Sequence, residues 1–94
     1  MSILGRFTKQ PAEKESYSIE FEDDLTGTDS IANAVSTVSP EGLTLVSTLV
    51  IGTRVKVLVS DGAAPGTKHK VTVTATTDDG RTLQDEFIVV IKEY

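Results

Sequence analysis

Hydrophobic and polar residues alternate most clearly over the last third of the chain. In residues 70–76, apolar side chains occupy the odd positions, and lysine or threonine occupies the even ones. Asp79-Gly80 separates this run from a second one, residues 82–91. Because an Asp-Gly step between two such runs is a strong signal for a tight turn, the pattern predicts a β-hairpin over His69–Ile91 and an antiparallel β class.

Four earlier segments also have the character of strands, and turn-forming residues separate them. In the first of them, Tyr17, Ile19 and Phe21 alternate with polar residues. In the second, Val35 occupies an odd and Val38 an even position, so a regular strand would place them on opposite faces. A β-bulge between them would bring both to one face. The four predicted strands are Glu15–Glu22, Ser30–Ser39, Leu43–Ile51 and Arg54–Ser60.

Six strands at short intervals, with no segment that favours a long helix, predict an immunoglobulin-like β-sandwich of two antiparallel sheets. A seventh strand would fit either in the first 14 residues or in the loop after Gly62. Residues 1–14 have no clean period, and their polar part contains Pro11. We therefore expect an extended leader over residues 1–14 and the sandwich domain over residues 15–94.

Two of the predicted strands, residues 43–51 and the last one, are apolar on both faces. One explanation is that bends or a flanking segment cover the second face within the chain. The other is an exposed edge or patch that another subunit covers. The expected faces are Phe87, Val89 and Ile91 against Ile88 and Val90 in the last strand, and Leu43, Leu45, Leu49 and Ile51 against Val46 and Val50 in residues 43–51.

The composition narrows the classes of partner. The chain has 94 residues, enough for one domain, and no cysteine, which excludes a disulfide framework and a thiol nucleophile. Its net charge of −5 argues against nucleic acid or an anionic membrane surface as a partner. The first residues lack the apolar stretch of a signal peptide, and the longest strictly apolar run, Ile88–Ile91, is far too short to cross a bilayer. We expect a soluble protein without a cleavable signal.

No combination of side chains indicates a catalytic, cofactor-binding or metal site. His69 is the single histidine, and it shares the parity of the inward residues of its strand, so a structural position is expected. The sequence has no nucleophile elbow and no phosphate-binding glycine loop, so an enzyme is not expected. The loop acids match no calcium-binding loop and are expected to be solvated turn residues: Asp23, Asp24, Asp29, Asp78 and Asp79.

Several sequence blocks have a layout found in a known family. They are Phe7–Glu13, Tyr17–Phe21 and Asp29–Ala32 near the start, and Gly66, Val71–Val73 and Asp79–Phe87 towards the end. With these blocks the chain resembles, over nearly its whole length, the phage fiber–tail adaptor family of compact immunoglobulin-like sandwiches. The most specific block is the Lys-Gln-Pro-x-Glu sequence that starts at Lys9.

The resemblance implies a non-enzymatic phage or prophage structural protein that joins tail and fiber components during virion assembly. Its partners would be other tail or fiber proteins, further copies of the chain included, in the virion or in the bacterial host cytoplasm. An alternative from a different class is a stand-alone immunoglobulin-like module that binds a carbohydrate or a cell-surface ligand. The residues expected to contact a partner are Phe7, Lys9, Gln10, Pro11, Ile88 and Val90.

Overall fold

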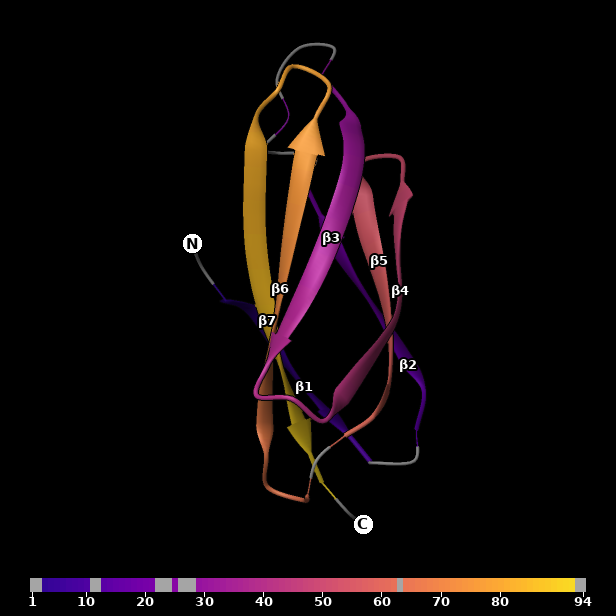
Figure 1. The fold of residues 1–94 in the computed structure, drawn as a ribbon, viewed down its shortest axis with the longest axis vertical. Helices are drawn as coiled ribbons and strands as arrows, with labels where there is room; N and C mark the ends of the chain where they lie inside the picture. Colours follow the sequence, from indigo (N-terminus) through magenta and orange to yellow (C-terminus); the bar gives the residue numbers. More distant parts are fainter. Residues whose placement is uncertain (1–2, 11–12, 22–24, 26–28, 63, 93–94) are drawn as a thin grey trace.

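The computed structural model describes residues 3–10, 13–21, 25, 29–62 and 64–92, and within these ranges it contains strands and no helix (Figure 1). The strands form two sheets, which confirms the predicted all-β sandwich. The strands are β1 (Ile3–Lys9), β2 (Glu15–Glu20), β3 (Ile31–Ser39), β4 (Leu43–Ile51), β5 (Arg54–Asp61), β6 (Lys68–Thr77) and β7 (Thr82–Ile91).

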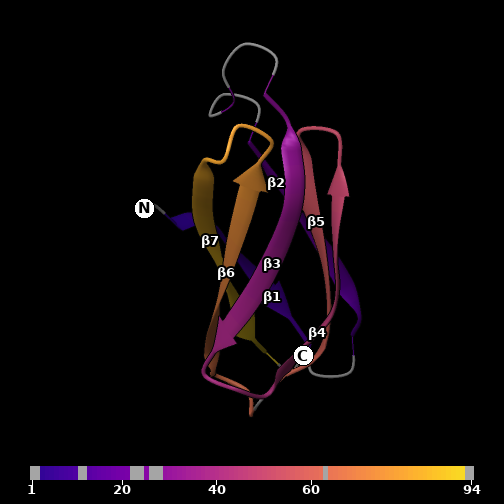
Figure 2. The ribbon, with the colours of Figure 1, turned by 45° about the horizontal axis from the view of Figure 1, so that its top comes forward.

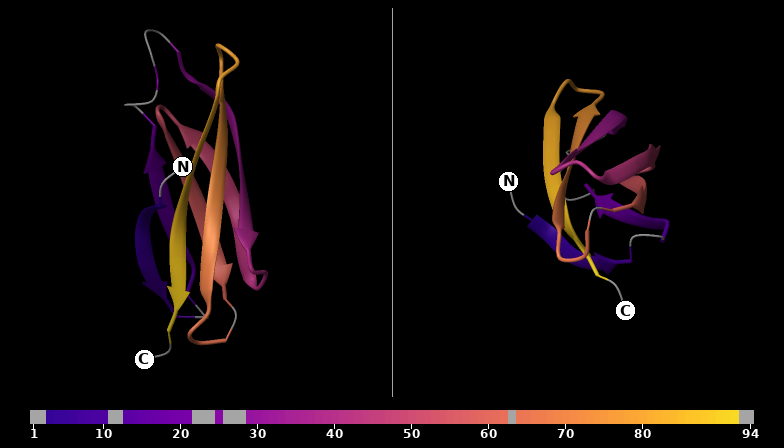
Figure 3. Two further views of the ribbon diagram at one scale, coloured as in Figure 1. Left: turned by 90° about the vertical axis from the view of Figure 1, so that its left-hand side faces the viewer. Right: turned by 60° about the horizontal axis from the view of Figure 1, so that its bottom comes forward.

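The order of the strands determines which of them lie at the edges. The larger sheet has the order β1-β7-β6-β3, and the smaller sheet has the order β2-β5-β4. The end-on view in Figure 3 shows the two sheets as separate layers. β1 and β2 are therefore edge strands on one side of the sandwich, and β3 and β4 are edge strands on the other. β3 and β4 contact each other across the two layers (Figure 2).

The seventh strand comes from the first 14 residues, one of the two places where the sequence left room for it. β1 runs parallel to β7, with Arg6 opposite Ile88 and Thr8 opposite Val90. The larger sheet is therefore mixed, and the expectation that both sheets are antiparallel is wrong for this pair of strands. The left view of Figure 3 shows β1 beside β7. Residues 3–9 thus belong to the larger sheet, and the independent folding of residues 15–94 stays a prediction.

The bulges differ from the one that the sequence predicted. The pairing of β3 with β6 is regular from Ala34 to Ser39, so the bulge expected between Val35 and Val38 is wrong. It is not needed, because Val38 packs against the core while Val35 remains 60% exposed on the outer face. The register of β3 shifts earlier instead, between Ile31 and Asn33.

A second register shift, between Leu45 and Ser47, changes which residues of β4 face the core and which face outward. Leu45 lies opposite the buried Val59, but beyond the shift Leu49 lies opposite Lys56, which belongs to the outer face of β5. The expectation that Leu43, Leu45, Leu49 and Ile51 share one face is therefore wrong: Leu43 is buried, whereas Leu49 and Ile51 are exposed.

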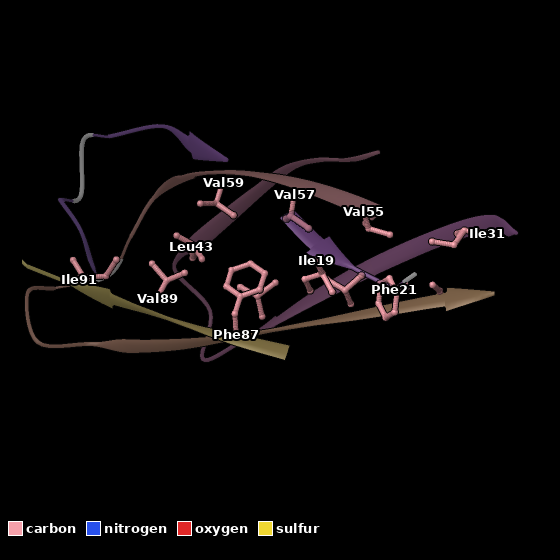
Figure 4. Close-up of a cluster of buried hydrophobic side chains, with 13 residues drawn as sticks. Ile19, Phe21, Ile31, Leu43, Val55, Val57, Val59, Phe87, Val89 and Ile91 are labelled. Carbon is pink, nitrogen blue, oxygen red and sulfur yellow. The ribbon is translucent and has the colours of Figure 1, made fainter. Parts of the chain in front are cut away.

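The core lies between the two sheets, where alternate residues of each central strand point inward (Figure 4). β5 contributes three valines that have no exposed surface, and β6 contributes Val71, Val73 and Ala75 in the same way. The parity predicted for these two strands is confirmed. The buried cluster consists of Ile19, Phe21, Ile31, Leu43, Val55, Val57, Val59, Val71, Val73, Ala75, Phe87, Val89 and Ile91.

Candidate protein–protein interface

The last strand, β7, is apolar on both faces and is a central strand of the larger sheet. It lies between β1 and β6, so it offers no free edge. Ile88 and Val90 point away from the core, yet each is only 9% exposed. On this outer face they are flanked by Lys70 and Lys68 of β6, which pair with them in register. Most of both side chains is therefore covered within the single chain, and their contact with a partner stays a prediction.

Lys9 lies at the end of β1 and is almost completely buried, with 1% of its surface exposed. Its Nζ donates hydrogen bonds to the backbone oxygens of Gln10, at 2.8 Å, and of Asp61. Its own backbone oxygen accepts a bond from the Lys92 N–H at 2.9 Å. Burial lowers the pKa of Lys9, and the nearby carboxylates of Asp61, Glu13 and Glu15 oppose this shift. These contacts attach the end of β1 to the ends of β5 and β7.

Phe7 is the most exposed of the described residues that the sequence assigned to a partner contact, at 39%. Its ring stacks on Tyr17 of β2, with centroids 4.6 Å apart, and meets Phe87 edge-on at 5.8 Å. This stack joins the edge strands β1 and β2 and leaves part of one aromatic ring accessible. Gln10 is half-buried, and its N–H donates to the Glu13 carboxylate at 2.7 Å. Pro11 lies outside the described residues.

Most of the large aliphatic side chains that are exposed among the described residues lie on β4, at the opposite side of the sandwich. One edge of β4 pairs with β5, and within the described residues no strand pairs with the opposite edge. The main-chain N–H and C=O groups along that opposite edge are therefore available for strand pairing. β4 contains no charged residue and no proline, the usual protection of an edge strand. We call this surface the open edge; its exposed side chains are Val46 (45%), Leu49 (52%), Val50 (37%) and Ile51 (45%).

The sequence pattern that indicates the open edge is a strand with apolar residues on both faces, and two strands of this chain have that pattern. Both β4 and β7 are apolar on both faces. The residues predicted to contact a partner include Ile88 and Val90 of β7, beside four residues of the first 14, and none of β4. The pattern alone does not tell which of the two strands is central, because strand order depends on long-range pairing. The alternation of apolar and polar residues also does not predict the bulge that turns Leu49 and Ile51 outward.

Two buried polar groups serve the fold. The His69 side chain is fully buried, and its Nδ1 lies 2.8 Å from the backbone oxygen of Pro40, which confirms the predicted structural position. The carboxylate of Asp29 accepts the backbone N–H groups of Ser30 and Asp79 at 2.9 and 3.1 Å. Its side chain is covered, so the expectation of a solvated residue is wrong for Asp29.

The pKa of Asp29 reflects these contacts. Burial by itself raises the pKa, but hydrogen bonds from Thr77, Asp79 and Ser30, together with the charge of Arg81, outweigh it. The pKa therefore lies below its ordinary value. Asp78 and Asp79 are exposed as expected, while Asp23 and Asp24 lie outside the described residues.

Neither a metal site nor a membrane-spanning helix is found in the described part of the chain. No group of three or more acidic or histidine side chains is positioned there to hold a metal ion. None of the described segments is a helix long and apolar enough to cross a bilayer. The exposed apolar residues described above define two candidate surfaces, the aromatic side at β1 and β2 and the open edge.

A comparison with protein families tests the resemblance noted in the sequence. A family model described as podophage GP4 fiber-tail adaptor protein gp77 matches residues 9–90. The chain belongs to this fiber-tail adaptor family. A comparison with curated proteins gives no match.

The part of the chain that matches the fiber-tail adaptor family contains β2 to β6 and nearly all of β7. It starts at Lys9, the buried last residue of β1, and includes all of β4. The open edge thus lies within the sequence shared with the adaptor family, whereas Phe7 precedes the match. This favours the open edge as the surface to examine first.

Proposed function

We propose that this chain is a non-enzymatic structural protein that joins tail and fiber components of a phage particle during assembly. The observation that carries the proposal is the family match over residues 9–90, which spans almost the entire sandwich. The role requires folded surfaces that remain available for other proteins. The open edge and the aromatic side at Phe7 have this property.

The placement of these two surfaces suits a joint between two different components. β1 and β3 are opposite edges of the larger sheet, and β2 and β4 are opposite edges of the smaller one. Phe7 therefore lies on the side of the sandwich away from the open edge. One component can occupy each side without competing for the same residues. The partners in this proposal are tail and fiber proteins. The chain binds them in the host cytoplasm during assembly and stays bound to them in the virion.

Deletion of the coding sequence from the phage that carries it tests the proposal. We expect particles whose tails lack fibers when viewed by electron microscopy, and recovery of fibered particles when the chain is supplied in trans. The virion proteins of both preparations are compared by mass spectrometry. Particles with a normal complement of fibers after the deletion would contradict the adaptor role.

A further inference from the structure

The end of β4 combines a free main-chain edge with outward apolar side chains. Leu49 and Ile51 point to the outer face of the smaller sheet, since their partners in register are Lys56 and Arg54, while Val50 pairs with the buried Val55. A strand added beside β4 would continue the sheet and cover these side chains. β3 packs against β4 from the other sheet, with Ser36 Oγ 2.5 Å from Thr48 Oγ1, but it does not pair with β4 as a strand. An unpaired edge with this composition is a site for strand pairing.

The charge next to this edge is opposite to the charge of the whole chain. The chain carries a net charge of −5, but the two charged side chains of β5 that flank Leu49 and Ile51 are the cations Lys56 and Arg54. Within the described ranges neither of them forms an ion pair, but Arg54 lies opposite Glu20 in the register of β2 and β5, whereas Lys56 lies opposite Ser18. A carboxylate on an added strand would lie on the same face with β4 in between, and the long side chain of Lys56 would extend past Leu49 to meet it.

We propose that the open edge binds an extended segment of a neighbouring tail or fiber protein, which adds to the smaller sheet as a strand beside β4. The segment carries apolar side chains at alternate positions, against Leu49 and Ile51, and a carboxylate that meets the side chain of Lys56. This inference rests on the proposed function and assigns it a surface and a partner chemistry.

A second copy of the chain fits this edge less well. In a β4–β4 pair the copies would place Lys56 and Arg54 of both chains on the same continuous outer face. No carboxylate of the partner's β4 would meet these cations, because β4 contains no charged residue. Charge complementarity therefore favours an acidic and apolar segment of another protein.

Photo-crosslinking in the assembled phage identifies the occupant. A photoreactive phenylalanine analogue replaces Leu49 in one phage and Val35 in a matched control. Val35 is also an exposed apolar residue of an edge strand, but it lies on the outer face of the other sheet. We expect position 49, and not position 35, to crosslink to a segment of a tail or fiber protein in which apolar and acidic residues alternate. A crosslink to a second copy, a segment without a carboxylate, or no crosslink at position 49 would overturn the proposal.

Complementation of the deletion phage tests the same surface without a probe. L49K should reduce the yield of fibered particles at least about tenfold, while V35K should complement like the unaltered chain. K56E should weaken complementation about tenfold, and exchange of the partner's acidic residue for lysine should restore it. Thermal melts of the purified variants serve as the folding control, since Leu49 and Val35 are exposed and Lys56 is half-buried on the outer face.

The results separate the two proposals. If the deletion itself leaves fibers in place, the adaptor role fails. If the deletion removes fibers but L49K and K56E complement as well as V35K, the adaptor role stands and the assignment of the open edge is overturned.

Discussion

Val73 lies in the middle of the buried cluster and has no exposed surface. V73D should therefore unfold the domain, because an aspartate there would be an unpaired charge between the two sheets, a cost of several kcal/mol. Thermal unfolding followed by circular dichroism measures the effect. T37D, at an exposed position of β3, is the control and should melt close to the unaltered chain. A cooperative melt of V73D at the parent temperature would refute the inward position of Val73.

Lys9 is expected to contribute stability through its buried contacts. K9A removes the hydrogen bonds to the Gln10 and Asp61 carbonyls and leaves space beside the ends of β5 and β7. We expect a loss of about 2–4 kcal/mol in the free energy of unfolding, measured with denaturant. The exposed Lys14 provides the control, and K14A should change stability by less than about 0.5 kcal/mol. Unchanged stability together with lost assembly would instead support the partner contact that the sequence suggested for Lys9.

Because of Asp29, the free energy of unfolding of the domain should depend on pH in the acidic range. Its pKa in the folded chain lies below the ordinary value of 3.8, so the unfolded chain binds the proton more readily. The stabilisation by its carboxylate is fully present above that value and is lost as the pH falls through the folded pKa. D29N should be less stable than the unaltered chain at neutral pH, and the difference should shrink in acid below 3.8. A difference that stays constant over this interval would show that the carboxylate charge is not involved.

At the scale of the elements, strands in which apolar and polar residues alternate strictly could be predicted from the sequence. Strands whose position depends on pairing with a distant part of the chain could not. The hairpin of β6 and β7 follows from residues 70–91 because local alternation and the Asp79-Gly80 turn point to the same structure. β1 lacks a clean period, and its pairing is parallel to a strand about 80 residues away in the sequence, which no local pattern encodes. For the same reason the sequence identified a two-faced strand as an assembly surface but not which of the two strands is exposed.

Removal of residues 1–14 tests whether the leader is separable from the sandwich. The sequence led us to expect that residues 15–94 fold alone and that the truncation weakens assembly. In the structure the truncation would expose the edge of β7 and remove Lys9 and Phe7, so we expect a lower melting temperature as well. Calorimetry of the truncated and complete chains measures this. Equal melting temperatures would establish residues 15–94 as an independent domain.

At the scale of the whole molecule, the chain on its own should be a monomer. Its net charge opposes self-association, and β4 has no charge to complement Lys56 and Arg54 of a second copy. Light scattering on size-exclusion fractions over a concentration series measures the mass. A discrete oligomer that the L49K substitution dissociates would show that the open edge binds a second copy instead.

The parallel pairing of β1 with β7 has a mechanical consequence. If a load pulls the beginning of β1 away from the end of β7, the two strands are drawn past each other along their length. The hydrogen bonds between residues 6–9 and 88–91, where the pairing is regular, then share the force. In an antiparallel terminal pair loaded at one end, the bonds would open one after another. The order of the strands in the larger sheet thus gives this small domain resistance to shear along the line that joins its two ends.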